Sequence, residues 1–143
     1  MKLLLLVALA FVACSKSAPP KADPLVEEFR ATERTCIAAF NDALARQRAN
    51  QIDELALAQE IDRDVLGPWR AVREKVNASA KTDELYTTLR KYLEARQVAW
   101  EAYVAALRSD SEAAARPHYD VYHQKHAEAR DLARDLGRLF RSL

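Results

Sequence analysis

The chain has 143 residues, of which 22 are basic and 21 acidic, and its formal net charge is +1. This balance argues against a nucleic-acid-binding protein, which needs a basic surplus to neutralise phosphates. The length fits one domain that can build its own core. Glycine occurs only twice and alanine is abundant, which predicts helices rather than sheets.

The first fourteen residues follow the order of a secretory signal. Lys2 supplies a positive charge, residues 3–13 form an unbroken apolar run, and Cys14 follows. A basic start, a short apolar core and small residues at the end are typical of a cleaved export signal. Eleven apolar residues span about 16 Å as a helix, which is too short to cross a bilayer.

Val12-Ala13-Cys14 resembles the lipobox of bacterial lipoproteins, a family that usually has Leu where this chain has Phe11. The resemblance implies cleavage before Cys14, a diacylglycerol on its sulfur and an acyl chain such as palmitate on the new amino group. Ser15, in place of Asp, implies the outer membrane, with the domain facing the periplasm. The alternative is an ordinary secreted protein in which Cys14 merely lies near the cut.

We therefore expect a signal peptide over residues 1–13, a lipidated tether over 14–23 and a helical domain over 24–143. The tether contains two prolines and no apolar pattern, which is typical of a flexible linker. Without Lys2 the mature chain has 21 basic and 21 acidic residues and no net charge. Its only cysteine besides Cys14 is Cys36, expected to be a buried thiol outside any internal disulfide.

Four amphipathic helices are predicted in the domain. They begin at Asp23-Pro24, near Asn50, around Thr82-Asp83 and after Ser109, which has capping-box spacing to Glu112. Apolar residues recur at three- and four-residue steps in each. The predicted inward positions are Val26, Phe29, Cys36, Ile37, Phe40 and Leu44; Leu55, Ala58, Ile61, Val65, Trp69, Val72 and Val76; Leu85, Leu89, Leu93, Trp100, Tyr103, Val104 and Leu107; and Ala115, His118, Tyr122, Ala129, Ala133, Leu136 and Phe140.

Four such helices with short connections predict an all-α fold, an antiparallel four-helix bundle. Pro68 follows Gly67 inside the second helix, and Pro117 lies inside the fourth. A proline lacks the amide proton and clashes with the preceding turn, so a kink or break is expected near each. These are either ordinary bends or the opening of a groove beside Trp69 or His118.

All three histidines lie between Pro117 and His126. Helical spacing places His118 and Tyr122 inward, as core polar residues or a small-ligand site. Asp120, His123 and His126 are candidate metal ligands, although the segment lacks the spacing of known metal motifs. The alternative is a buried His118 with a polar partner and two surface histidines.

Several surface features indicate binding to other molecules. Leu57, Leu66 and Val98 lie off the main apolar stripes and are candidate contacts for a partner protein. A ridge of basic residues follows the last turns of the fourth helix and would face lipid headgroups, or be an ordinary solvated face: Arg130, Arg134, Arg138 and Arg141.

No nucleophile has a base beside it in the sequence, so we expect no enzymatic activity and no cofactor. Two hypotheses remain for function. The first is a membrane-anchored module that binds another envelope protein or has a structural role there, by analogy with helical pilotins. The second is a small-ligand or metal carrier that uses the His118–His126 segment.

Overall fold

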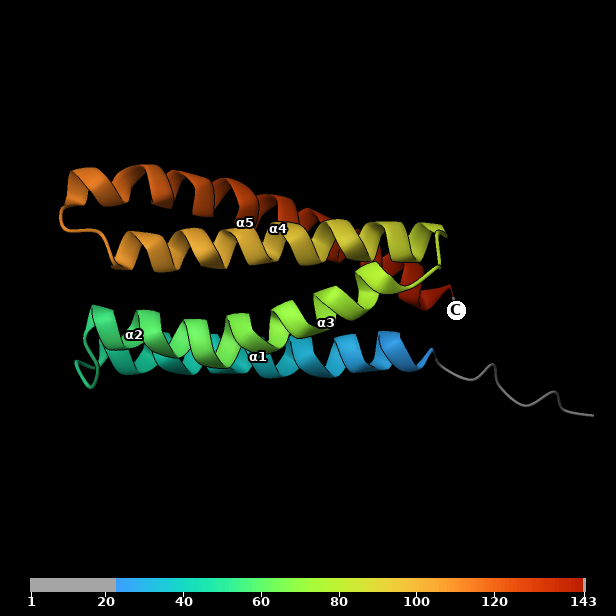
Figure 1. Ribbon diagram of the computed structural model, residues 1–143, viewed down its shortest axis with the longest axis horizontal. Coiled ribbons are helices and arrows are strands. Elements are labelled where there is room, and N and C mark those ends of the chain that lie inside the picture. Colours follow the sequence, from blue (N-terminus) through green and yellow to red (C-terminus); the bar gives the residue numbers. More distant parts are fainter. Residues whose placement is uncertain (1–22, 143) are drawn as a thin grey trace, which may run out of the picture.

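The computed structural model describes residues 23–142, so the predicted signal, Cys14 and nearly all of the tether lie outside the described residues. The helices are α1 (Pro24–Arg48), α2 (Glu54–Glu60), the π-helix η1 (Ile61–Leu66), α3 (Gly67–Ala78), α4 (Glu84–Leu107) and α5 (Glu112–Arg141). Because α2, η1 and α3 follow one another without a break, the chain forms four antiparallel rods, which confirms the predicted bundle (Figure 1). Within residues 23–142, no helix is apolar over a length that would cross a bilayer.

Aspartate side chains cap three of the helices. Asp23 and Asp83 accept the amide protons of Leu25 and Tyr86, each at 3.0 Å, and these starts agree with the sequence-based prediction. A capping oxygen of this kind satisfies an amide that has no partner within the helix. The third, Asp53, accepts the amide of Ala56 at 2.7 Å, so α2 begins at Glu54.

The predicted helix start near Asn50 is wrong because this residue ends the preceding helix. Its φ of 56° is left-handed, a conformation that Asn tolerates better than most residues. The amides of Asn50 and Gln51 donate to the carbonyl oxygens of Gln47 and Arg46, each at 2.9 Å. This is the hydrogen-bond pattern of a Schellman motif, which closes α1.

The cap of the last helix also differs from the prediction. Ser111, rather than Ser109, accepts the amide of Ala114 at 3.2 Å. The Ser109 hydroxyl instead donates to the Ala105 carbonyl oxygen of α4 at 2.9 Å. Ser109 therefore belongs to the end of one helix and Ser111 to the start of the next.

The two internal prolines do not break the helices that contain them. Before Pro68 the chain adopts the wider π-helical turn, and the Gly67 amide donates to the Asp62 carbonyl oxygen, five residues back. π-Bulges of this type accommodate irregularities in a helix. Pro117 lies in the second turn of α5, which continues as a helix to Arg141.

Most of the predicted inward residues form the core, with α4 at its centre. Trp69 of α3 packs edge-on against Trp100 at 4.9 Å and against Phe29 of α1 at 6.2 Å between ring centroids. Two of the apolar residues predicted to be in the core are exposed instead, Ile37 at 36% and Leu55 at 57%. At these two positions the side of the helix that faces the core differs from the apolar stripe predicted from the sequence.

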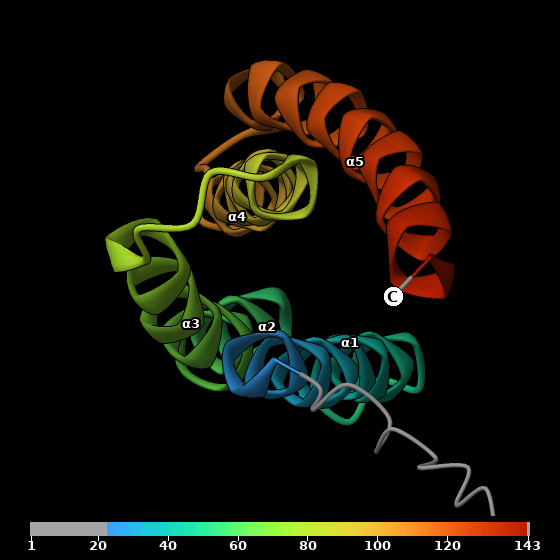
Figure 2. The same ribbon diagram turned by 90° about the vertical axis from the view of Figure 1, so that its right-hand side faces the viewer.

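The α5 helix leans on α4 rather than on the rest of the bundle. No Cα atom of α5 within the described residues lies within 8 Å of one in α1, and only the last turns of α5 approach that helix (Figure 2). There the Phe140 ring lies 6.5 Å from that of Phe29. Buried alanines allow α4 and α5 to pack closely, namely Ala95, Ala99, Ala102 and Ala106 on α4 and Ala115 and Ala129 on α5.

Candidate functional site

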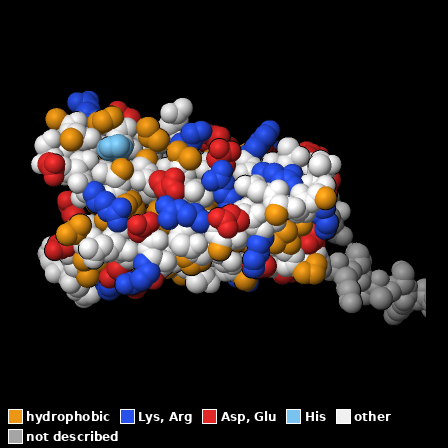
Figure 3. Space-filling view, in the orientation of Figure 1, with side chains coloured by type: hydrophobic (Ala, Val, Ile, Leu, Met, Phe, Trp, Pro, Cys, Tyr) orange, Lys and Arg blue, Asp and Glu red, His pale blue; other side chains and the backbone are white. Residues whose placement is uncertain are grey.

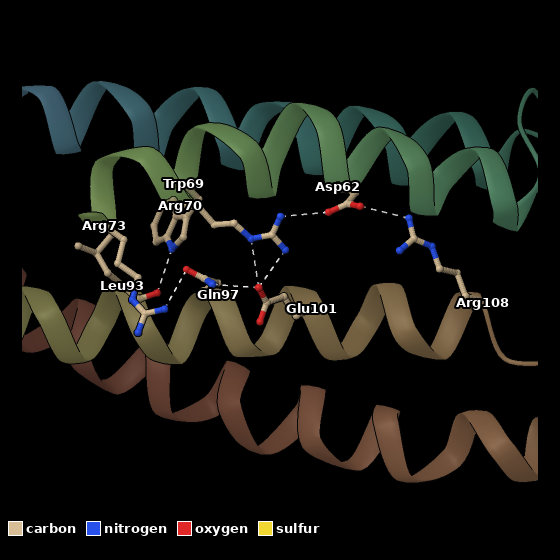
Figure 4. Close-up of polar contacts among 8 residues, drawn as sticks. All are labelled: Asp62, Trp69, Arg70, Arg73, Leu93, Gln97, Glu101 and Arg108. Carbon is tan, nitrogen blue, oxygen red and sulfur yellow. Dashed lines mark hydrogen bonds and ion pairs between the residues drawn. The ribbon is translucent and has the colours of Figure 1, made fainter. Parts of the chain in front are cut away.

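A row of polar side chains joins the second rod to α4 (Figure 4). Glu101 accepts hydrogen bonds from Arg70 at 2.9 and 3.2 Å and from the Gln97 amide at 2.9 Å. Arg70 also donates to Asp62 at 3.3 Å, and Asp62 accepts a second arginine, Arg108, at 3.3 Å. Arginine and carboxylate side chains alternate along the row, so their charges balance one another.

This row is best explained as a device that sets the register of two helices. Its charged groups are between a third and a half exposed, where ion pairs contribute about 0–1 kcal/mol each. The same face of the molecule mixes acidic and basic side chains without a large patch of one sign (Figure 3). We therefore look for a binding site elsewhere.

A chain of aromatic rings runs between α1, α4 and α5. Phe40 of α1 contacts Trp100 and Tyr103 of α4, with ring centroids 5.8 and 5.7 Å apart. Tyr103 in turn contacts Tyr119 and Tyr122 of α5 at 6.0 and 5.0 Å. We call the aromatic seam the set formed by these five residues together with Arg96 and His126.

The rings become more accessible from α1 towards α5. Phe40 and Trp100 are buried, whereas Tyr103, Tyr119 and Tyr122 are half-buried. Exposed Ile37 lies on the same side of α1 as Arg30, whose guanidinium lies 5.3 Å from the centre of the Phe140 ring of α5. The seam is thus partly apolar and partly accessible. It joins α4 to α1 and α5 in the part of the bundle where α5 has diverged from α1, a divergence that can be followed in Figures 1 and 2.

Arg96 provides the charge of the seam. Its guanidinium lies 5.6 Å from the centres of both the Tyr92 and Trp100 rings, and Nη1 lies 3.2 Å from His126 Nδ1. Among residues 23–142 no carboxylate oxygen lies within 4.0 Å of an Arg96 nitrogen, and the buried Nε has no hydrogen-bond partner. A half-buried arginine held by aromatic faces and no counter-charge is an unusual arrangement.

The carboxylate of Glu33 is connected to Arg96 through the side chain of Tyr92. Tyr92 donates its hydroxyl proton to a carboxylate oxygen of Glu33 on α1. Burial, rather than this carboxylate, is the main reason that the pKa of Tyr92 is raised. The neutral phenol therefore stands between Glu33 and Arg96.

His126 contacts both Arg96 and the Tyr122 ring. Partial burial, and then the positive charges of Arg96 and Arg130, lower its pKa below the ordinary 6.5. Neutral His126 can accept the Arg96 proton at Nδ1, which the protonated ring cannot. The pair is thus most stable at pH values where His126 is neutral.

The predicted metal ligands do not assemble into a site. Asp120, His123 and His126 are all exposed, and no group of three His, Cys, Asp or Glu side chains within the described residues is arranged to hold a metal ion. The three residues lie on successive turns of α5.

The prediction that His118 points into the core is wrong, because its side chain is exposed. Tyr119 takes the inward position and contacts Tyr103, while Tyr122 is half-buried as a member of the seam. On α5 the inward positions alternate in steps of four and three residues. Those that are buried or half-buried are Ala115, Tyr119, Tyr122, Ala129, Ala133, Leu136 and Phe140, while His126 shares their side of the helix but is exposed.

Two of the predicted partner contacts are wrong as well. Leu57 and Leu66 are fully buried, at 0% and 1% exposure, and Val98 is half-buried. The second rod lies between α1 and α4, so it buries a wider face than a single stripe. The π turn also rotates the positions that follow it, which brings Leu66 inward beside Val65.

The basic ridge of α5 is largely paired along its own helix. Arg134 and Arg138 form ion pairs with Asp131 and Asp135, one turn earlier, and Arg130 lies 3.9 Å from Asp131. Arg141 completes the ridge and, with Arg134 and Arg138, lines an open depression. The ridge lies at the end of the bundle where α1 begins, as the antiparallel arrangement requires (Figure 1).

Sequence reasoning missed Arg96 and Tyr119. The available signal was the regular spacing of inward positions on α4, where Arg96 falls between Leu93 and Trp100 in the apolar stripe. An arginine at such a position must reach water or a partner, because a charge is costly to bury alone. Comparison of the chain with protein-family models, curated proteins and solved structures gives no match.

Proposed function

We propose that this chain is a lipid-anchored, non-enzymatic module that binds another envelope protein at its aromatic seam. The observation that carries the proposal is the seam itself, in which half-buried Tyr103 contacts half-buried Tyr119 and Tyr122. His126 lies beside Tyr122 and joins these rings to Arg96, for which no carboxylate partner lies within residues 23–142. Aromatic residues and arginine are the side chains most enriched in protein interfaces. The aromatic rings of the seam lie away from the start of α1, so a membrane at that end would not hinder a partner.

The anchor in this proposal is Cys14, lipidated as the lipobox-like sequence implies, in an outer membrane and facing the periplasm. Several acyl chains hold a protein on a membrane far more firmly than one. The tether would then let the bundle present its seam to a partner. Replacement of Cys14 by Ser is expected to move the protein from the membrane fraction to the soluble periplasmic fraction.

Site-specific photo-crosslinking in the bacterium that encodes the chain tests the partner. A photoreactive residue at Ile37 or Tyr119 reports on the seam, from α1 and α5 respectively. Val121 is the matched control, because it is 40% exposed but lies on the opposite side of α5 from Tyr119. We expect the same protein to be captured from Ile37 and Tyr119 and not from Val121, whereas equal capture at all three, or none, contradicts the proposal.

The second candidate is a small-ligand carrier that uses the same surface. Tyr122 and His126, both from the predicted histidine segment, lie in the seam with ring centroids 5.5 Å apart. Retention of a low-molecular-mass compound through gentle purification, lost on Tyr122→Ala, would favour this candidate over a protein partner.

A further inference from the structure

We infer that Arg96 binds a carboxylate carried by the apolar segment of the partner that lies in the aromatic seam. The inference rests on the proposed function and adds the chemistry of recognition to it. Arginine has five N–H donors and a planar fork that matches a carboxylate. Among the described residues only Nη1 has a partner, and that partner is the neutral His126.

The environment of Arg96 holds the guanidinium in place without neutralising it. Tyr92 and Trp100 cover it through their ring faces, so its position is fixed by packing and cation–π attraction rather than by an ion pair. A fixed donor in partly apolar surroundings interacts with an anion more strongly than a free arginine in water does. The geometry is that of a preorganised receptor.

The surrounding charges also favour an anion. Arg130 on α5 lies close enough to the seam for its charge to act on His126. Glu33 reaches Arg96 only indirectly, because its carboxylate accepts a hydrogen bond from Tyr92, whose ring contacts the Arg96 guanidinium. Within the described residues Arg96 has no carboxylate partner of its own, which suits an acidic residue within an apolar partner segment.

Benzoate is a suitable probe, since it joins a carboxylate to an aromatic ring, and benzamide is its uncharged twin. The full lipidated protein in detergent micelles would be titrated with each, and the ¹⁵N resonances of the Arg96 side chain followed by NMR. We expect benzoate to bind with a Kd of about 10 mM or tighter, and benzamide about tenfold more weakly. No saturable shift with benzoate, or equal affinities, would overturn the inference.

Two variants show whether Arg96 is responsible. Arg96→Gln is expected to abolish the preference for benzoate, and Arg96→Lys to keep part of it, since lysine retains the charge without the fork. Arg116→Gln is the control, because Arg116 is exposed on the first turns of α5. Thermal unfolding of each variant verifies that it is folded, and a preference that survives in folded Arg96→Gln is incompatible with the inference.

A final comparison joins the probe to the partner. Crosslinking from Ile37 should fall at least several-fold in Arg96→Gln and remain unchanged in Arg116→Gln. If benzoate binds through Arg96 but crosslinking is unaffected by its loss, the carboxylate does not come from the partner and the inference is wrong. If Ile37 captures no protein at all, the proposed function fails, while the benzoate titration still reports on Arg96.

Discussion

The Trp69 indole nitrogen donates a hydrogen bond to the main-chain oxygen of Leu93 at 2.9 Å, which joins α3 to the middle of α4. Both side chains are fully buried. A buried indole N–H without a partner would be costly, so this bond is what permits the large ring at the centre of the bundle. It also fixes the position of α3 along α4, next to the polar row on the surface.

Trp69→Phe should test this contact, since it removes the donor and keeps an aromatic ring. We expect a loss of about 1–2 kcal/mol in the free energy of unfolding, from the hydrogen bond and the smaller ring. Trp69→Ala should cost about 3–5 kcal/mol through the cavity that it leaves. Urea unfolding of the full chain measures both losses, and Ala71→Ser, at an exposed position, is the control. A Trp69→Phe variant as stable as this control would contradict the contribution of the hydrogen bond.

Cys36 should be protected from thiol reagents in the folded protein. Its thiol donates to the Val65 carbonyl oxygen at 3.4 Å in the π segment, and burial raises the pKa of Cys36 to about 11. At pH 8 only about one thiol in a thousand is then the reactive thiolate. Labelling of the Cys14→Ser variant with iodoacetamide at pH 8 should be slow until urea unfolds it, whereas rapid labelling of the native protein would show that Cys36 is accessible.

Asp23 should make the start of α1 sensitive to acid. Its carboxylate caps the helix, accepts the Tyr86 hydroxyl at 2.8 Å and pairs with Lys81, and these contacts hold its pKa below the ordinary 3.8. Because the folded pKa is the lower one, the stabilisation is complete above pH 3.8 and is lost as the pH falls through the folded value.

Asp23→Asn separates the charge from the cap, because Asn keeps a capping oxygen. The variant should be less stable than the wild type at pH 6, and the difference should shrink towards pH 3. Asp23→Ala should lose about 1 kcal/mol more, with the cap. Unfolding free energies measured across this pH range give the answer, and a difference independent of pH would argue against the ionic contribution.

His126 should give the fold a second dependence on pH, in the range where histidine titrates. Arg96 from α4 and Arg130 and His123 from α5 face its ring, and its pKa in the folded protein is lowered. The unfolded chain therefore binds the proton more readily, so stability is highest above pH 6.5 and falls as the pH decreases through the two values. His126→Gln should flatten the profile between pH 7 and 5.

Exposed His118→Gln provides the matched control for this profile. It should leave the dependence on pH as it is in the wild type, because His118 lies in solvent. If the two variants have the same profile, the environment of His126 has no energetic consequence. Binding of the proposed carboxylate at Arg96 should also raise the pKa of His126, because the negative charge would offset the positive charge of Arg96 that opposes protonation of the ring.

Features of the fold that depend on neighbouring residues can be predicted from the sequence. Asp23 and Asp83 mark the starts of two helices, because a capping oxygen accepts a hydrogen bond from an amide two or three residues further along the chain. Regular apolar spacing identified Phe29, Trp69 and Trp100 as core residues, and four long amphipathic helices leave few alternatives to a bundle.

Which side of each helix contacts which neighbouring helix depends on how the four helices pack together. The second rod lies between two helices and contains a π turn, so Leu57 and Leu66 are buried although they lie off the predicted stripe. Because α5 packs along α4 and approaches α1 only at its last turns, Tyr119 faces the bundle and His118 faces solvent. The seam around Arg96 joins residues from three helices, and such a meeting depends on packing between segments far apart in the chain, which local periodicity does not encode.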